Sequence, residues 1–467
     1  MPKSQKKKGR SRRPAAGEAT GAGDGSTQSR DEDQAKAAFL GQVLDETDRR
    51  LAERSTGFRA PSKVYLYAGV CALLVAYVLQ PGDFKPNSIR LGSPVDWSGS
   101  LDPATHQISN VERIHPKLLH SPDQFVITSE DVMYFGTIEG AIWKWTQSQQ
   151  PVVIAHIGNE SCVYPTQGTQ CGRPLIMTIS EDEQTLYVTD VHYGLSAISL
   201  PAGHVTRLLS VGQLVQEGEP RITLLKGVYR VGDHLYLGEP WTEWDCDGNI
   251  AASFSAHDDG RILQYNTKTD KVRVFAKGLY FPSGLSQTRD GRYLIVTELT
   301  RARLVWLNLA TGKVVKTSGP MPGLPDVITA HPGHGGGHLV SIEVVRNAMV
   351  DYMAENKWFK RVLYKLLPKS VLLRFQDDYN LCVHITDTST AAHQDESSNQ
   401  GDDVIDESPD LGGDIVDSWH ASRGRVVSAV LQCRVHGDYM YFTSRKPDSA
   451  LSRVKLRHSH VKRKPGK

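Results

Sequence analysis

A short apolar stretch that ends in a small residue recurs from about residue 120 to residue 456, at intervals of roughly fifty residues. Alternating apolar residues and glycine-containing turns fill the sequence between the copies, which is typical of β-strands. The six copies are Val132–Gly136, Thr185–Thr189, His234–Gly238, Arg292–Thr297, His338–Ser341 and Tyr439–Thr443. A strand-rich unit of this period cannot bury both of its faces alone, so the copies must pack on one another. Six units closed into a ring predict an all-β, six-bladed β-propeller, whose function resides where the innermost strands converge on the axis.

Two insertions interrupt the repeat before its last unit. Residues 347–367 place apolar side chains on one helical face, which predicts an amphipathic helix within 345–370. Its basic residues suit either contact with lipid headgroups or packing on the propeller with a solvated basic face, and both interpretations stay open. Residues 387–424 are rich in Asp and Glu, with no Lys or Arg before Arg423, which predicts a disordered acidic loop.

The N-terminal sixty residues differ from the rest of the chain. They are basic at the start and poor in apolar side chains, which predicts a largely disordered tail over 1–60. The run from Lys6 to Arg13 would fit a nucleic-acid-binding tail or, beside a membrane helix, a cytoplasmic topology signal. The chain as a whole carries a net charge of only +2, so we expect no nucleic-acid partner.

The segment from Val64 to Leu79 contains no charged or strongly polar residue. As a helix it would reach about 24 Å, short for a bilayer core, with tyrosines suited to the interfaces. It predicts a signal-anchor helix over 61–81, a buried core helix being the alternative. More basic residues precede it than follow it, which places the N-terminus in the cytoplasm and the propeller outside it, at the endoplasmic reticulum or plasma membrane.

If the propeller lies on the translocated side of the membrane, glycosylation and disulfide formation are both expected there. Asn159 opens the triplet Asn-Glu-Ser, so we expect it to be glycosylated. Of six cysteines, Cys71 lies in the predicted membrane helix. Cys162 and Cys171 flank a short polar loop and predict a disulfide. The others are Cys246, Cys382 and Cys433. Since these are odd in number, at least one thiol is left over, and their pairing stays undetermined.

Six motifs in order resemble those of a known family. They are Ser121–Asp123, Cys171–Leu175, Tyr187–Leu195, Asp259–Tyr265, Gly278–Leu285 and Pro322–Asp326. Together they resemble the strictosidine synthase-like six-bladed propellers, over about residues 55–456 apart from the acidic loop. The resemblance implies a membrane-anchored layout with an axial metal site.

The positions that would hold that metal have changed. The resemblance implies Glu, Asn, Asn and Asp-Asn at positions that here hold Asp123, Lys226, Ser283, and Asp326 with Val327. Calcium requires six to eight oxygen ligands, and an ammonium at the same place opposes a dication. We therefore expect no cofactor, and at most a degenerate calcium site at the two carboxylates.

Lys226 is the predicted substitute for the ion. We expect its ammonium to neutralise both Asp123 and Asp326, while Arg173 adds a fork of donors beside them. These four residues and Ser283 form the predicted axial ligand-binding set.

Catalysis has a single weak candidate. The resemblance implies a catalytic Glu on the inner strand of the last blade for amine–aldehyde condensation, but the stretch around Leu431 offers no carboxylate. We therefore do not expect strictosidine synthase activity. Related lactonases and esterases of this fold use an axial metal and a His, for which His192 is the candidate base. A lone His after a strand is more often structural.

Two function classes follow from these residues. The altered metal site favours a propeller that binds a small ligand or a protein and has lost its chemistry. The retained Asp123, Arg173 and Asp326 keep open a hydrolase of small esters or lactones.

The predicted organisation has seven parts. They are a cytoplasmic tail over 1–60, an anchor over 61–81, a connector over 82–118, a propeller over 119–456 with its insertions at 345–370 and 387–424, and a basic tail over 457–467.

Overall fold

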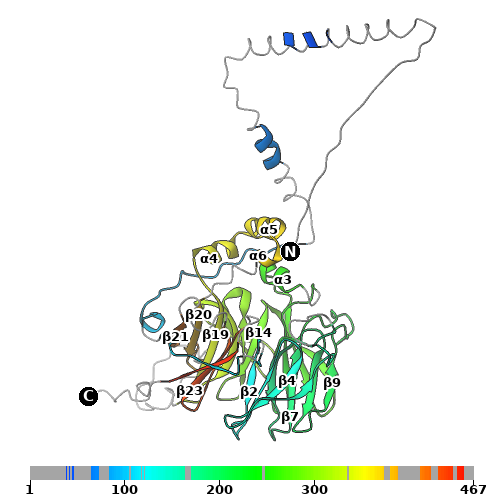
Figure 1. Cartoon of the computed structure of the whole chain (residues 1–467), viewed down its shortest axis with the longest axis vertical. Coiled ribbons are helices and arrows are strands. Elements are labelled where there is room, and N and C mark those ends of the chain that lie inside the picture. Colours follow the sequence, from blue (N-terminus) through cyan, green and yellow to red (C-terminus); the bar gives the residue numbers. More distant parts are fainter. Residues whose placement is uncertain are drawn as a thin grey trace, which may run out of the picture. The chain divides into compact units, whose positions relative to one another are not determined.

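The chain divides into two compact units, Met1–Leu79 and Gln80–Lys467. The structure is a computed structural model, drawn in Figure 1. It describes residues 38, 41–42, 45–46, 65–72, 84–104, 107–116, 118–119, 121–162, 170–244, 248–333, 336–372, 379–387, 411–421, 430–444 and 450–456.

In the first unit, residues 65–72 are helical and lie within the predicted anchor. Over the described ranges, no helix is both long enough and apolar enough to cross a membrane. The remainder of the 61–81 segment lies outside the described residues, so the anchor stays a prediction.

The second unit is the predicted six-bladed propeller, built from six four-stranded sheets. In blades 1 to 5 the four strands follow one another along the chain from the axis to the rim. Blade 1 contains β2 Phe125–Ile127, β3 Met133–Gly136, β4 Ala141–Trp145 and β5 Val152–His156. Blade 2 contains β6 Pro174–Ile179, β7 Thr185–Asp190, β8 Gly194–Ser199 and β9 Val205–Leu209. Blade 3 contains β10 Gly227–Val231, β11 His234–Glu239, β12 Gly260–Asn266 and β13 Val272–Leu279.

The sixth blade closes the ring with a strand from the connector. Blade 4 contains β14 Pro282–Gln287, β15 Tyr293–Glu298, β16 Arg303–Asn308 and β17 Val314–Thr317. Blade 5 contains β18 Gly323–Ala330, β19 His338–Val345, β20 Asn380–Ile385 and β21 Ile415–Ala421. Blade 6 contains β22 Val430–His436, β23 Tyr439–Ser444, β24 Leu451–Lys455 and β1 Glu112–Ile114. Because β1 pairs with β24, the propeller begins before the predicted boundary at residue 119.

The repeated stretch in the sequence is the second strand of each blade, and its small residue faces the inner strand of the next blade. In four blades this residue carries a hydroxyl that donates to a carbonyl oxygen across the gap. The pairs are Thr189 to Lys226 at 2.8 Å, Thr297 to Asp326 at 2.8 Å, Ser341 to Leu431 at 2.6 Å and Thr443 to Asp123 at 2.5 Å. A hydrogen bond of this kind satisfies a buried carbonyl that would otherwise destabilise the fold.

In the other two blades the residue is a glycine. A Cβ added to Gly136 would lie only 2.5 Å from the Cβ of Pro174 in the next blade. One added to Gly238 would lie 3.1 Å from the carbonyl oxygen of Pro282. The residue is small in every copy because two blades approach most closely there.

The hydrophobic core is divided among the gaps between blades. Six apolar clusters of the described residues each draw on two neighbouring blades. Tyr134 and Leu186 share the cluster between blades 1 and 2, and Leu339 and Phe442 share that between blades 5 and 6. Fully burying one such side chain contributes about 1.5–3 kcal/mol, so the stability of the ring depends on every gap being filled.

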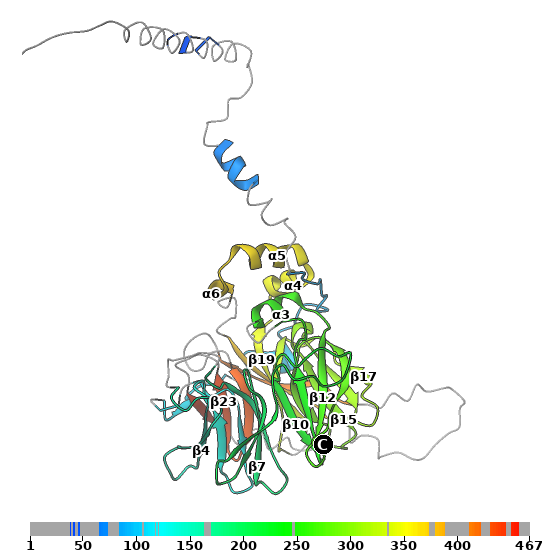
Figure 2. The ribbon, with the colours of Figure 1, turned by 90° about the vertical axis from the view of Figure 1, so that its right-hand side faces the viewer.

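Helices gather over one face of the propeller, as Figures 1 and 2 show. They are α3 Asn249–Ser255, α4 Ala348–Glu355, α5 Lys357–Leu366 and α6 Lys369–Leu372. The predicted single helix over 347–367 is therefore two, which meet at Asn356. Asn347 begins α4 as its N-cap, accepting hydrogen bonds from the backbone N–H groups of Met349 and Val350. We call these four helices the cap.

The prediction of one disordered acidic loop over 387–424 is wrong in part. Strand β21 lies inside that range and is the fourth strand of blade 5, with Trp419 buried. The acidic composition concealed it, although Trp419 and Ala421 alternate with polar residues at its end and the strand pairs with β20. Residues 388–410 and 422–429 lie outside the described residues.

Two disulfides are present. The predicted bond between Cys162 and Cys171 is confirmed. A second bond joins Cys382 of β20 to Cys433 of β22 and so links blade 5 to blade 6. Cys71 is a free thiol, and Cys246 lies outside the described residues.

Candidate functional site

Equivalent residues of the six inner strands form a ring near the axis, at the face that carries the cap. Four of these residues are the ones whose carbonyl oxygens accept the hydroxyl contacts across the blade gaps. The other two lie in β6 and β14, in the same bulge that contains Asp326 in β18. The axial ring consists of Asp123, Leu175, Lys226, Ser283, Asp326 and Leu431. Four of the predicted residues are thus brought to equivalent positions. Arg173 lies two residues before the ring position of its blade, which Leu175 occupies.

Each axial carboxylate has its own cation. The Lys226 ammonium forms a short ion pair with Asp326, and the Ser283 hydroxyl donates to the same carboxylate oxygen. Asp326 is only 1% exposed, so this pairing compensates a charge that would otherwise be costly to bury. Asp123 instead faces Arg173, whose Nε lies 3.8 Å from its Oδ2. The ion pair of Lys226 with Asp326 is one half of the predicted bridge, and its extension to Asp123 stays a prediction.

The axial ring does not fit a calcium ion. Two of its six members are leucines, which offer no side-chain oxygen, and one is a lysine. The Asp326 oxygen that would face an ion is engaged by an ammonium and a hydroxyl. Over the part of the chain that the structure describes, no group of three or more His, Cys, Asp or Glu residues could hold a metal.

An apolar cavity of about 150 Å³ adjoins Lys226 beneath the cap. Its walls come from the connector, from α3, α4 and α5, and from the ends of inner strands. The lining apolar residues include Leu91, Ile250, Phe254, Phe281, Leu299, Leu324, Val350 and Met353. The polar groups that reach it include Lys226, Glu343 and Lys360. A site with apolar walls and a few convergent polar groups is typical of small-ligand binding.

Lys360 of α5 points into the molecule, although both interpretations of the sequence placed the basic residues of this segment at the surface. It is 4% exposed, and its Nζ donates to the carbonyl oxygen of Asn87 at 2.8 Å. Burial lowers the pKa of Lys360 from 10.5 to about 8. The Lys360 amine, which reaches the cavity, therefore loses its proton more readily near neutral pH than an exposed lysine does.

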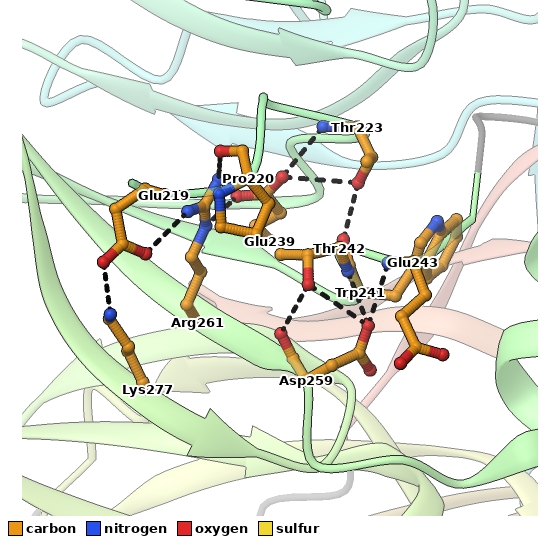
Figure 3. A network of polar contacts seen from close by, with 10 residues as sticks. All are labelled: Glu219, Pro220, Thr223, Glu239, Trp241, Thr242, Glu243, Asp259, Arg261 and Lys277. Carbon is orange, nitrogen blue, oxygen red and sulfur yellow. Dashed lines mark hydrogen bonds and ion pairs between the residues drawn. The ribbon is translucent and has the colours of Figure 1, made fainter. Parts of the chain in front are cut away.

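A buried ion pair between β11 and β12 orders the segment before Lys226 and the start of the loop that leads to α3 (Figure 3). The Arg261 Nε donates to Glu239 at 2.6 Å, with both side chains buried. The other Glu239 oxygen accepts from the Thr223 backbone N–H at 2.8 Å, three residues before Lys226. The Thr223 hydroxyl in turn donates to the carbonyl oxygen of Trp241 at 2.5 Å. Burial raises the pKa of Glu239 despite Arg261, so the ion pair only partly offsets the cost of desolvation.

Blade 4 repeats this arrangement. Glu298, at the end of β15, accepts from the Tyr280 backbone N–H at 2.9 Å and from Arg303. The Arg303 side chain is more exposed than that of Arg261, so the ion pair of Arg303 with Glu298 is better solvated than that of Arg261 with Glu239.

His192 lies in the turn between β7 and β8 and is not among the described residues that line the cavity. Its backbone N–H donates to Asp190 Oδ1 at 2.8 Å, and that of Tyr193 donates to the same atom at 3.0 Å. This arrangement shows His192 as part of a turn organised by Asp190.

Among the described acidic residues near the axial ring, Asp190 has a clearly shifted pKa. It is fully buried, and burial raises its pKa from 3.8 to about 6, against the backbone hydrogen bonds that lower it. The folded state therefore binds the Asp190 proton more tightly than the unfolded state between about pH 4 and pH 6.

We expect this carboxyl to make the protein less stable as pH rises through that window. Its contribution is fully present below about pH 4 and lost above about pH 6, a difference of about 3 kcal/mol. Asp190→Asn should remove that part of the pH dependence, measured by denaturant unfolding at pH 4 and pH 7. Asp258→Asn, at an exposed position, is the matched control. An Asp190→Asn protein that keeps the wild-type difference between the two pH values contradicts the prediction.

Asn159 is exposed in the turn that follows β5. Its Oδ1 accepts a hydrogen bond from the backbone N–H of Ser161 at 2.9 Å. The position is accessible to a glycan, and the modification stays a prediction.

The sequence interpretation missed the cavity itself. Helix α3 forms a wall of the site that no motif indicated, and the buried Trp241 packs in a cluster with the lining residues Phe281 and Leu299. The four-residue spacing of Lys360 and Tyr364 places them on one face of α5, but nothing in the sequence states that this face is buried.

Comparisons with known proteins agree with the motifs and the fold. A family model described as Strictosidine synthase matches residues 228–309, which include Arg261 and Ser283. The adipocyte plasma membrane-associated protein of Gallus gallus is 29% identical over 434 residues, which cover 89% of this chain and 96% of that protein. Protein STRICTOSIDINE SYNTHASE-LIKE 13 of Arabidopsis thaliana is 25% identical over 259 residues, covering 52% and 62% of the two chains. The chain is similar to the strictosidine synthase-like propellers.

The predicted resemblance to this family is thereby confirmed. Among solved structures, the luciferin-regenerating enzyme superposes with a TM-score of 0.45 at 12% identity, over 74% of this chain and 95% of that one. In this propeller, the axial ring combines Leu175, Lys226 and Leu431 with the two carboxylates.

Proposed function

We propose that this chain is a membrane-anchored propeller that binds a small amphipathic ligand in the cavity beneath the cap. The ligand has an apolar body that fits the walls and an oxygen acceptor that reaches Lys226 or Lys360. The observation that carries the proposal is the ion pair of Lys226 with Asp326, because it lies beside an apolar cavity at positions where the resemblance implies metal ligands.

The size of the cavity limits the ligand. A cavity of about 150 Å³ with mainly aliphatic and aromatic walls has room for a molecule about the size of benzene. A small aromatic or short-chain compound with one polar end therefore suits the site better than a sugar or a nucleotide.

Anchoring is the second part of the proposal. It rests on the apolar segment Val64–Leu79, on the basic flank before it, and on relatives whose name associates them with the plasma membrane. The orientation we propose leaves the N-terminus in the cytoplasm and puts Asn159 on the glycosylated side.

The ester or lactone hydrolase that the sequence left open has no supporting geometry over the described residues. His192 serves a turn, and Ser283 donates its hydroxyl to Asp326 rather than to a base. We therefore propose a binding function and not this chemistry.

Filling the cavity should abolish ligand binding. Ser253 lines the cavity from α3, and Ser253→Trp adds a side chain of about the cavity's own size. The full chain in detergent should bind an environment-sensitive fluorescent probe with an apolar ring and an anionic end, and the variant should lose at least about tenfold in affinity.

Two controls make the result specific. Val314→Trp places the same side chain on the exposed strand β17 and should leave probe affinity unchanged. Equal probe affinity for the wild type and Ser253→Trp, with both proteins folded, rejects the cavity as the binding site.

A further inference from the structure

The outer face of the cap presents large apolar side chains to solvent. Tyr352 is 54% exposed and Trp358 is 58% exposed, while Met349 and Leu366 are exposed nearby. Tyr352 of α4 contacts Phe359 of α5 edge to face, with ring centroids 5.2 Å apart, so the two helices share one surface. We call these five residues the cap face. Isolated exposed apolar residues are ordinary, but a contiguous group on adjacent helices marks an interaction surface.

A row of positive charge borders the cap face. Lys357, Arg361 and Lys365 are four residues apart along α5 and so lie on one side of the helix, next to the row that contains Trp358 and Leu366. The ten residues of α5 include no acidic residue. An amphipathic helix with aromatic and aliphatic residues beside a basic row is suited to the interface of an anionic bilayer.

The connector, which follows the predicted anchor in the sequence, packs directly on the cap. Phe84 is buried and stacks on Tyr364 of α5, with ring centroids 4.0 Å apart. The Asn87 backbone N–H donates to the carbonyl oxygen of Ser255 at 2.7 Å, and that of Ile89 donates to Ala354 at 2.8 Å.

The length of the intervening chain limits how far the cap can be from the membrane. Residues 80–83 are all that separate the predicted span Val64–Leu79 from Phe84. Five Cα–Cα steps reach at most about 17 Å. Phe84, which stacks on α5, therefore lies no more than about 17 Å from Leu79 at the end of the predicted span.

We propose that the cap face docks on the surface of an anionic lipid bilayer. The inference rests on the proposed anchor, which keeps the cap within reach of the membrane. Trp358, Phe359 and Leu366 enter the boundary between headgroups and acyl chains, and the basic row lies among the anionic headgroups.

Docking connects the bilayer with the cavity. The opposite sides of α4 and α5 supply Val350, Met353 and Lys360 to the cavity wall. A helix pair with lipid on its outer face and the cavity on its inner face gives an amphipathic ligand a short route from the bilayer to Lys226.

Quenching by lipids with brominated acyl chains tests the docking. The full chain is placed in nanodiscs of brominated phosphatidylcholine, with or without brominated phosphatidylserine, and its tryptophan fluorescence is compared with that in unbrominated discs. Trp358→Phe keeps an apolar ring on the cap face but removes the reporter, so the difference between the two proteins isolates Trp358. We expect the wild type to be quenched in phosphatidylserine discs and Trp358→Phe to lose most of that quenching.

Charge reversal provides the second arm. Lys357→Glu with Lys365→Glu should reduce the Trp358 quenching severalfold in phosphatidylserine discs. Lys268→Glu with Lys313→Glu makes the same change of net charge at exposed positions in blades 3 and 4 and should leave the quenching intact.

Each alternative result is decisive. Quenching that is unchanged in Trp358→Phe, or equal in the two charge-reversed proteins, overturns the proposal. A disc-bound dimer that shields Trp358 from bromine also overturns it, in favour of a second copy on the cap face. Probe binding in detergent does not depend on lipid, so failure of docking and failure of the proposed ligand-binding function are distinguishable.

Discussion

Replacing Lys226 by Met should cost the propeller about 3–5 kcal/mol of unfolding free energy. The substitution keeps the length of the side chain but removes the ammonium that pairs with Asp326. Asp326 would then be an almost fully buried carboxylate with the Ser283 hydroxyl as its remaining side-chain donor among the contacts described above. Denaturant unfolding of the wild type and the variant measures the loss.

The reason for the loss can be separated from simple repacking. Lys226→Met combined with Asp326→Asn removes both charges and should recover most of the stability. Lys277→Met, which breaks the solvent-exposed pair with Glu219, should cost less than about 1 kcal/mol.

Lys226→Asn should regain part of its stability when calcium is added, since it restores an amide oxygen, whereas the wild type should show no calcium-dependent shift in melting temperature. A clear calcium shift in the unmutated protein means that the axial metal site is intact.

Arg261→Met should have a loss of similar size, about 3–5 kcal/mol, because Glu239 would remain as a fully buried and unpaired carboxylate. The variant should also bind the fluorescent probe more weakly, since Glu239 orders Thr223 and, through it, Trp241 beside the cavity. Urea unfolding and probe titration in detergent measure the two effects.

The pH dependence and a matched pair test the mechanism. Burial already raises the pKa of Glu239, so the loss in Arg261→Met should shrink as pH falls and the acid takes up a proton. Arg303→Met breaks the equivalent pair with Glu298 in blade 4, where the arginine is more solvated, and should cost less. Equal losses for the two variants at every pH would contradict the role given to burial.

The ring of six blades could be predicted because the repeat is local. Each copy of the repeat is a short apolar stretch followed by a small residue, and that residue must be small wherever it meets the next blade, as at Gly136 and Thr297. The disulfide between Cys162 and Cys171 was predictable for the same reason, since its two ends are near in sequence. The residues at the implied metal positions, such as Lys226 and Ser283, could also be identified from the sequence, because the motifs around them fix the alignment.

Other features depend on contacts between segments that are distant in sequence, and the sequence by itself did not determine them. The closing strand β1 pairs with β24 over more than three hundred residues, and β21 lies within an acidic segment whose composition concealed it. Lys226 and Asp326 are a hundred residues apart, and the closure of the ring brings them together.

The sequence determined the class of fold, which residues occupy the predicted metal positions, and the basic character of α5. The tertiary structure decided which face of α5 is buried, where Lys360 points, and that a cavity lies beside Lys226. The physical reason is that a strand repeat reports its own period, whereas a cavity and a buried charge are set by side chains from the connector, the inner strands and the cap that meet only in the folded chain.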